Sequence, residues 1–227
     1  MIRLIICFCA FPLLLQPEAR AQTGAELLAK TIAYHDPDGV WPTFQQELFF
    51  ETDMPDGSVR SSQVKIDNAT GTFEYQNPDR SFGIKMDSCY HISGEVRECD
   101  RIARTRNYYV YLWGLPMKLM DEGTDLDEEV YSEQIEDKAY QVLKVTYPDD
   151  IWYFYINPET YAMEAYKFYK DEPNQKGEII YLDGEMEVAG MKIPVARAWY
   201  RTENDEYLAT DKLVKTVSLE DSNLLRK

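Results

Sequence analysis

The sequence predicts a mainly β protein of the α+β class, with one antiparallel sheet of about ten or eleven strands. Runs rich in Val, Ile, Tyr, Phe and Thr recur along most of the chain between short turn-forming clusters. Strand follows strand in the second half, without the long helical spacing that parallel strands need. Helical periodicity occurs in two places, near the N-terminus and in the centre, so we expect two helices beside the sheet.

The first 21 residues have the pattern of a secretory signal peptide. Arg3 supplies a positive charge and Leu4–Leu15 form an apolar run. Ala19 and Ala21 are small residues at the two positions that signal peptidase recognises before its cleavage site. The apolar run is shorter than the roughly 20 residues that span a bilayer, which argues against a membrane anchor. We therefore expect cleavage after Ala21, a periplasmic or secreted protein, and one domain over residues 22–227.

The first element of this domain is an amphipathic helix from Gly24 to about Tyr34. Leu27, Leu28 and Ile32 lie on one stripe at helical spacing. The segment His35–Gly39 contains Pro37 and ends the helix. Its His and two Asp residues suit either a metal site or a turn rich in Asx residues, and the turn is favoured.

Strands are expected from Phe44 onward because turn residues punctuate the chain there. The clusters lie at Met54–Gly57, Asn77–Asp79, Glu136–Lys138, Pro148–Asp150, Asn157–Thr160, Glu172–Asn174 and Glu203–Asp205. The stretch Asp121–Glu129 is mostly acidic and is expected to be a solvated connection.

A second helix is predicted from Asp100 to Trp113. Ile102, Tyr109 and Trp113 recur at helical spacing, and Gly114 with Pro116 stops the helix. Ordinary core packing explains its aromatic residues. A lid that covers an apolar concavity also explains them, together with the apolar segment Leu115–Met117 that follows.

Alternation along three consecutive strands defines an apolar face and a polar face. Short turns predict that Phe154 lies opposite Met163, and Trp152 opposite Ala165. The apolar face then contains Leu143, Val145, Trp152, Phe154, Ile156, Met163 and Ala165, and the solvent-tolerant face Lys144, Thr146, Tyr153, Tyr155 and Glu164. Two helices are few to cover such a sheet, so either the sheet curls on itself or it leaves a cavity.

Two cysteines remain after removal of the signal, Cys89 and Cys99. In an oxidising compartment such a pair is compatible with one disulfide. A metal or redox pair is the alternative, although nine intervening residues suit neither a CxxC motif nor a compact zinc knuckle.

The charge and the motifs exclude several classes of function. The chain contains 40 acidic and 24 basic residues, a net charge of −16, which disfavours nucleic acid and anionic membranes as partners. It has no nucleophile elbow, zinc-protease motif, P-loop or dinucleotide-binding motif. We predict no catalytic residue, cofactor or metal. A secreted hydrolase that uses His35 or His91 is the least favoured alternative.

The order of elements resembles the LolA-like family of periplasmic lipoprotein and lipid carriers. That resemblance implies a strongly curved, incomplete β-barrel closed by helices over a hydrophobic cavity, and a lid-locking arginine, for which Arg104, Arg106 and Arg197 are candidates. The chain is also similar to an uncharacterised group of secreted Gram-negative proteins placed near that fold. Four segments carry this similarity: Tyr34–Pro37, Asn107–Leu119, Trp152–Glu164 and Arg197–Tyr200.

These observations predict a monomeric periplasmic binding protein that holds a lipid, an acyl chain or an acylated protein beneath the central helix. Burial of about 0.8 kcal/mol per methylene would supply the affinity. The predicted ligand contacts are Tyr109, Trp113, Leu115, Met117, Leu143, Val145, Trp152, Phe154, Met163 and Trp199. A protein-interaction module with a filled core and an acidic outer surface is the alternative.

Overall fold

The computed structural model describes residues 21–225 and contains one large sheet with three α-helices. The helices are α1 (Gly24–His35), α2 (Cys99–Trp113) and α3 (Leu219–Leu225), with 3₁₀ turns η1 (Trp41–Thr43) and η2 (Met117–Met120). The strands are β1 (Gln45–Asp53), β2 (Val59–Asp67), β3 (Thr72–Gln76), β4 (Arg80–Lys85), β5 (Ser88–Gly94), β6 (Asp125–Leu126), β7 (Tyr131–Ile135), β8 (Lys138–Thr146), β9 (Ile151–Ile156), β10 (Met163–Asp171), β11 (Lys176–Val188), β12 (Met191–Arg201) and β13 (Tyr207–Ser218). The predicted signal peptide lies, except for Ala21, outside the described residues.

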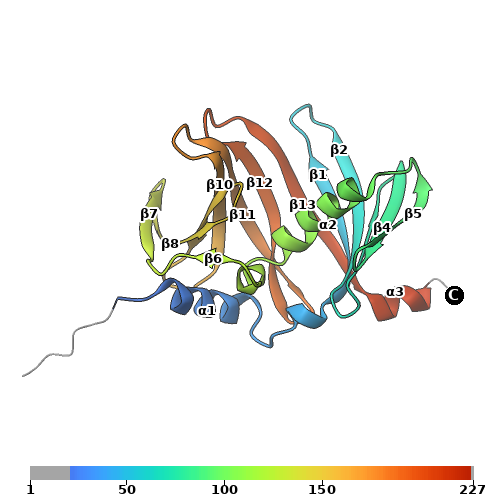
Figure 1. Cartoon of the computed structure of the whole chain (residues 1–227), viewed down its shortest axis with the longest axis horizontal. Coiled ribbons are helices and arrows are strands. Elements are labelled where there is room, and N and C mark those ends of the chain that lie inside the picture. Colours follow the sequence, from blue (N-terminus) through green and yellow to red (C-terminus); the bar gives the residue numbers. More distant parts are fainter. Residues whose placement is uncertain (1–20, 226–227) are drawn as a thin grey trace, which may run out of the picture.

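Every strand pairing in the sheet is antiparallel, as the sequence predicts. The order is β5-β4-β3-β2-β1-β13-β12-β11-β10-β9-β8-β6, and β7 also pairs with β8. Strands β5 to β1 form one arm, and β13 to β6 form the other. In Figure 1 the sheet curves around α2, which crosses between the two arms, while α1 runs along one end of the sheet. Within the described chain the terminal strands β5 and β6 do not pair, so the curved sheet is an open half-barrel.

The described residues form thirteen strands, more than the ten or eleven predicted. Part of the excess is β6, inside the acidic stretch expected to be a connection. Two tight turns, between β4 and β5 and between β11 and β12, use positive φ angles at Met86 (52°) and Ala189 (53°). Neither Met nor Ala favours that conformation, although Gly190 at a φ of 86° follows Ala189 in the second turn.

Both predicted helices are present at nearly the predicted bounds. Thr23 and Glu26 form a reciprocal capping box that starts α1. Gly114 ends α2, where a Cβ atom would overlap the ring of Trp41. The third helix was not predicted. Its local signal is Ser218, whose hydroxyl accepts from the backbone N–H of Asp221 at 3.1 Å and so caps α3.

The predicted faces are correct for β8 and β9, where Val145 lies opposite Trp152. They are wrong in part for β10. Phe154 pairs with Tyr166 instead of Met163, and Trp152 pairs with Phe168 instead of Ala165. Met163 pairs with Ile156, two positions from the predicted partner, and a register shift between Met163 and Ala165 then moves the following side chains to the other face.

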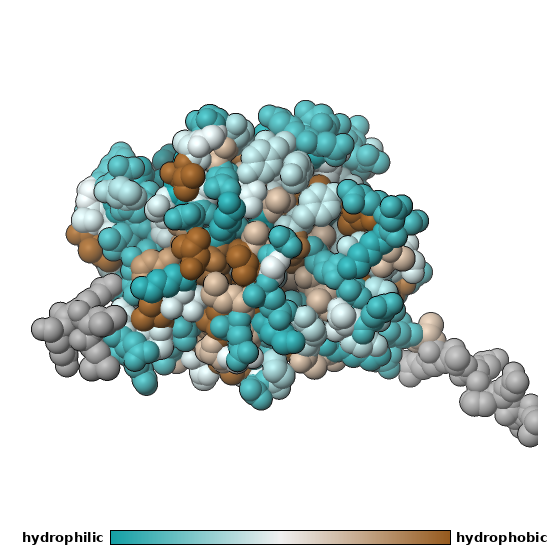
Figure 2. All heavy atoms as spheres, turned by 180° about the vertical axis from the view of Figure 1, so that it is seen from behind, coloured by the Kyte–Doolittle hydropathy of each residue, from teal (hydrophilic) through white to brown (hydrophobic). Residues whose placement is uncertain are grey.

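Ala165 therefore lies on the outer face, in a second small cluster with Val142 and Tyr155. Tyr155 is 1% exposed, so this face is less open to solvent than the alternation predicts. Its hydroxyl donates to Glu133 at 2.6 Å, which satisfies the buried polar group. Seen from behind in Figure 2, hydrophilic side chains cover much of the surface and hydrophobic ones gather near its middle.

Candidate functional site

Helix α2 lies in the concave side of the sheet and contacts both arms through its aromatic residues. Tyr109 and Trp113 face the first arm, where the Trp113 ring is 4.5 Å from the ring of Phe50 on β1. Tyr111 faces the second arm, 5.5 Å from the ring of Trp152 on β9. Because opposite faces of the helix contact opposite arms, α2 spans the opening of the half-barrel.

A disulfide attaches the start of α2 to the edge strand β5. Cys89 and Cys99 are bonded, with their Cα atoms 5.6 Å apart, which confirms the predicted pairing. The bond joins the first residue of the helix directly to the sheet. The N-terminal end of the helix is therefore fixed covalently, whereas its C-terminal end is held by noncovalent contacts.

Arg197 on β12 provides the principal polar contact at the C-terminal end. Its side chain is fully buried, and its Nη2 donates to the carbonyl of Leu112 at 3.0 Å. The guanidinium carbon lies 3.5 Å from the ring centroid of Trp113. A cation at the last turn also complements the helix dipole. Of the three candidate arginines, Arg197 is the one that holds the C-terminal end of this helix to the sheet.

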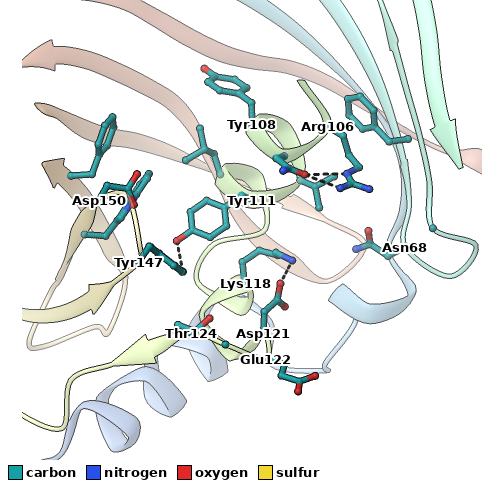
Figure 3. A pocket seen from close by; sticks show the side chains of 18 of the residues that line it. Asn68, Arg106, Tyr108, Tyr111, Lys118, Asp121, Glu122, Thr124, Tyr147 and Asp150 are labelled. Carbon is teal, nitrogen blue, oxygen red and sulfur yellow. Dashed lines mark hydrogen bonds and ion pairs between the residues drawn. The ribbon is translucent and has the colours of Figure 1, made fainter. Parts of the chain in front are cut away.

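A cavity of about 1070 Å³ opens beside α2 and η2. Its apolar wall combines Tyr111 on α2 with Trp152, Phe168 and Trp199 on the second arm. In Figure 3, Tyr111 and Tyr147 point toward each other, and their hydroxyls are 3.0 Å apart. The stacked rings of Trp152 and Phe168 are 4.7 Å apart and make one wall flat and apolar.

The polar lining of the cavity is more acidic than basic. Six carboxylates face three cations: Asp67, Asp87, Asp121, Glu122, Asp150 and Glu178 against Arg106, Lys118 and Lys170. Burial raises the pKa of Glu178, which pairs in register with Phe168. Burial and Asp211 raise the pKa of Tyr108 well above its ordinary value. The excess of carboxylates over cations in this lining disfavours a ligand with an anionic group beside the apolar wall.

Two of the ten predicted contact residues, Trp152 and Trp199, line this cavity. The other eight belong to or pack against the same hydrophobic core but do not line it: Tyr109, Trp113, Leu115, Met117, Leu143, Val145, Phe154 and Met163. Sequence reasoning missed Phe168 and Tyr147, since the wrong register for β10 removed Phe168 from the apolar face. Most of the predicted contact residues thus pack in or against the core, and the cavity lies beside α2.

The two histidines are not arranged for catalysis. Both ring nitrogens of the buried His35 are bonded to backbone groups, Nδ1 to the carbonyl of Lys192 and Nε2 to the N–H of Met163. Asp36 accepts from the N–H groups of Val40 and Trp41, which is the predicted turn role. His91 lies exposed on the edge strand.

The described residues contain no group of three or more His, Cys, Asp or Glu side chains that could hold a metal ion. No helix among them has the length and apolar character needed to cross a membrane.

Residues 2–216 match the model of a family of unknown function, DUF6503. The chain belongs to this family. No curated protein matches the DUF6503 chain. Its fold, however, is shared with solved structures of low sequence identity.

A LolA superfamily protein from Nitrosomonas europaea is 14% identical, with a TM-score of 0.56, and the match covers 89% of this chain and 97% of that one. A putative outer membrane lipoprotein-sorting protein domain from Vibrio parahaemolyticus is 11% identical, with a TM-score of 0.50 and the same coverage. At these identities the likeness shows the fold alone. It confirms the LolA-like half-barrel that the order of elements predicts.

Proposed function

We propose that this DUF6503 protein is a periplasmic or secreted binding protein that holds a hydrophobic ligand in the cavity beside α2. The observation that carries the proposal is the continuous aromatic wall of Tyr111, Trp152, Phe168 and Trp199 along an open cavity. The predicted signal peptide and the disulfide support export, because disulfides persist in oxidising compartments. The lipoprotein-sorting description of the Vibrio structure supports a lipid or acyl chain as the ligand.

The acidic lining narrows the ligand class. Carboxylates beside an apolar wall repel a free fatty acid, whereas an uncharged or zwitterionic lipid meets no such repulsion. Association depends on apolar burial, about 0.8 kcal/mol for each methylene that enters the cavity. No covalent step is involved, and the protein acts as a monomer that releases the ligand unchanged.

The test combines extraction with a binding assay. Mass spectrometry of an organic extract of the purified protein should identify a bound lipid, and the uncharged probe 1-N-phenylnaphthylamine should bind with enhanced fluorescence. Val110 lines the cavity from α2, so Val110→Trp should fill space and weaken probe binding by about tenfold.

Val214→Trp is the matched control, because Val214 is 47% exposed and does not line the cavity. It should bind the probe like the wild type. The proposal would be overturned if repeated extracts contained no lipid and the probe showed no enhanced fluorescence with the protein. Equal losses in the two folded variants would show that the probe binds elsewhere.

A further inference from the structure

A basic groove lies along the N-terminal part of α2 and meets the ligand cavity at Tyr108. It has a volume of about 500 Å³ and is lined by Arg97, Arg101, Arg104, Thr105 and Tyr108. Arg101 and Arg104 are exposed, and Arg97 is half-buried. Positions 101, 104 and 108 follow the three- and four-residue spacing of one helix face. The three arginines therefore form a positive stripe along the groove, with Glu98 and Asp100 between Arg97 and Arg101 in the sequence.

These arginines are not engaged in ion pairs within the described chain. Among the described residues, no carboxylate oxygen lies within 4.0 Å of these three guanidinium groups, although ion pairs of that length occur elsewhere on the surface. Arg104 donates weakly to the carbonyl of Asp100 at 3.4 Å, and Arg97 lies 5.6 Å from the ring centroid of Phe82. Their guanidinium groups keep most of their donors free, and such planar donors match carboxylates in bidentate geometry.

The position of this stripe is unexpected in so acidic a chain. The chain contains 40 acidic and 24 basic residues, yet four arginines fall within residues 97–106. Arg106, the fourth, lies on the cavity side of the helix. An acidic partner is repelled by most of the surface and attracted at the groove, which orients its approach.

We propose that this groove on α2 docks an acidic segment of a partner protein. A short acidic segment can enter the groove without approaching the acidic remainder of the surface, whereas a flat anionic membrane would meet much of that surface. Val96, next to Arg97, is 74% exposed, which offers an apolar contact that a simple inorganic anion would not use. The observations thus favour a peptide segment over a membrane or a free anion.

The groove is also joined structurally to the ligand cavity. Tyr108 lines both, stacks 5.8 Å from the ring of Trp199, and donates to the carboxylate of Asp211. The disulfide at Cys99 fixes the same end of α2 to the sheet, so a docked segment rests on a firmly attached surface. Docking at the groove does not require an occupied cavity, and its test is independent of the proposed function.

The test measures fluorescence anisotropy of a labelled hexaglutamate peptide with the purified protein at low salt. Arg101→Glu/Arg104→Glu should weaken binding at least tenfold, and added salt should weaken wild-type binding because the contacts are charged. Lys176→Glu/Lys215→Glu is the matched control, since it changes net charge equally and neither lysine lines the groove. It should bind within about twofold of the wild type.

Arg101→Gln/Arg104→Gln provides a milder variant should the charge reversal impair folding, and it should also lose most of the binding. Absence of peptide binding would overturn the proposal, as would equal losses in the groove variant and its control. Binding to vesicles that contain phosphatidylglycerol tests the alternative that the groove binds an anionic membrane. Arginine-dependent binding to those vesicles without binding to the peptide would assign the groove to a membrane and refute the protein partner.

Discussion

Removal of the disulfide between Cys89 and Cys99 should destabilise the protein by an amount that follows from the length of its loop. The two residues are separated by 10 positions. In the chain-entropy model, opening a loop of this length raises the entropy of the unfolded chain and lowers the free energy of unfolding by about 3 kcal/mol at 25 °C. For a domain of this size, that loss lowers the melting temperature by about 6–12 °C.

The assay is urea unfolding of the wild type with and without a phosphine reductant, beside Cys89→Ser/Cys99→Ser. Reduced wild type and the double variant should unfold alike, and the variant should not respond to the reductant. Hydrogen exchange should rise most at the start of α2, where the bond attaches the helix to β5. A variant within about 0.5 kcal/mol of oxidised wild type would refute this reasoning, and two free thiols by alkylation and intact mass would refute the bond itself.

Three further predictions concern the core and the helix. Arg197→Met should cost about 1–3 kcal/mol and increase hydrogen exchange at the C-terminal end of α2, because the Leu112 carbonyl loses its charged donor. Unchanged exchange there would contradict the locking role. Phe154→Ala should cost about 3–5 kcal/mol in urea unfolding, since Phe154 is fully buried, whereas Val214→Ala at the exposed control site should change stability by less than about 0.5 kcal/mol. Burial lowers the pKa of His35 in the folded protein below 6.5, so below about pH 6.5 the unfolded state binds more protons than the folded state and the free energy of unfolding decreases. His35→Gln should flatten this dependence of stability on pH. An unaltered pH profile in that variant would exclude His35 as its cause.

Features that depend on neighbouring residues were predictable. The capping residues before α1, the periodicity of α2 and its Gly114 stop act within one or two turns of the chain. The pairing of β8 with β9 was predictable too, because a short turn sets the register of the strands that it connects. Cys89 and Cys99 lie close enough in sequence for their bond to be inferred from spacing and compartment.

The errors arose where one local irregularity displaces many side chains. A single register shift in β10 moved Ala165 outward and Phe168 inward, which changed the composition of the cavity wall. Positive φ angles at Met86 and Ala189 created turns that their residue types do not mark. A one-residue change of register reverses the face of each following side chain, so such errors propagate along a strand.

The sequence by itself determined the antiparallel β class, the two principal helices, the disulfide and the LolA-like order of elements. The tertiary structure decided how far α2 fills the concave side, which aromatic residues remain along a cavity, and that Arg197 holds the C-terminal end of the helix. It also placed Arg97, Arg101 and Arg104 on one groove, with no ion pair to a carboxylate of the described residues 21–225. Periodicity and turn chemistry are encoded over a few residues, whereas empty space and buried charge contacts depend on where distant strands meet after the sheet has curved.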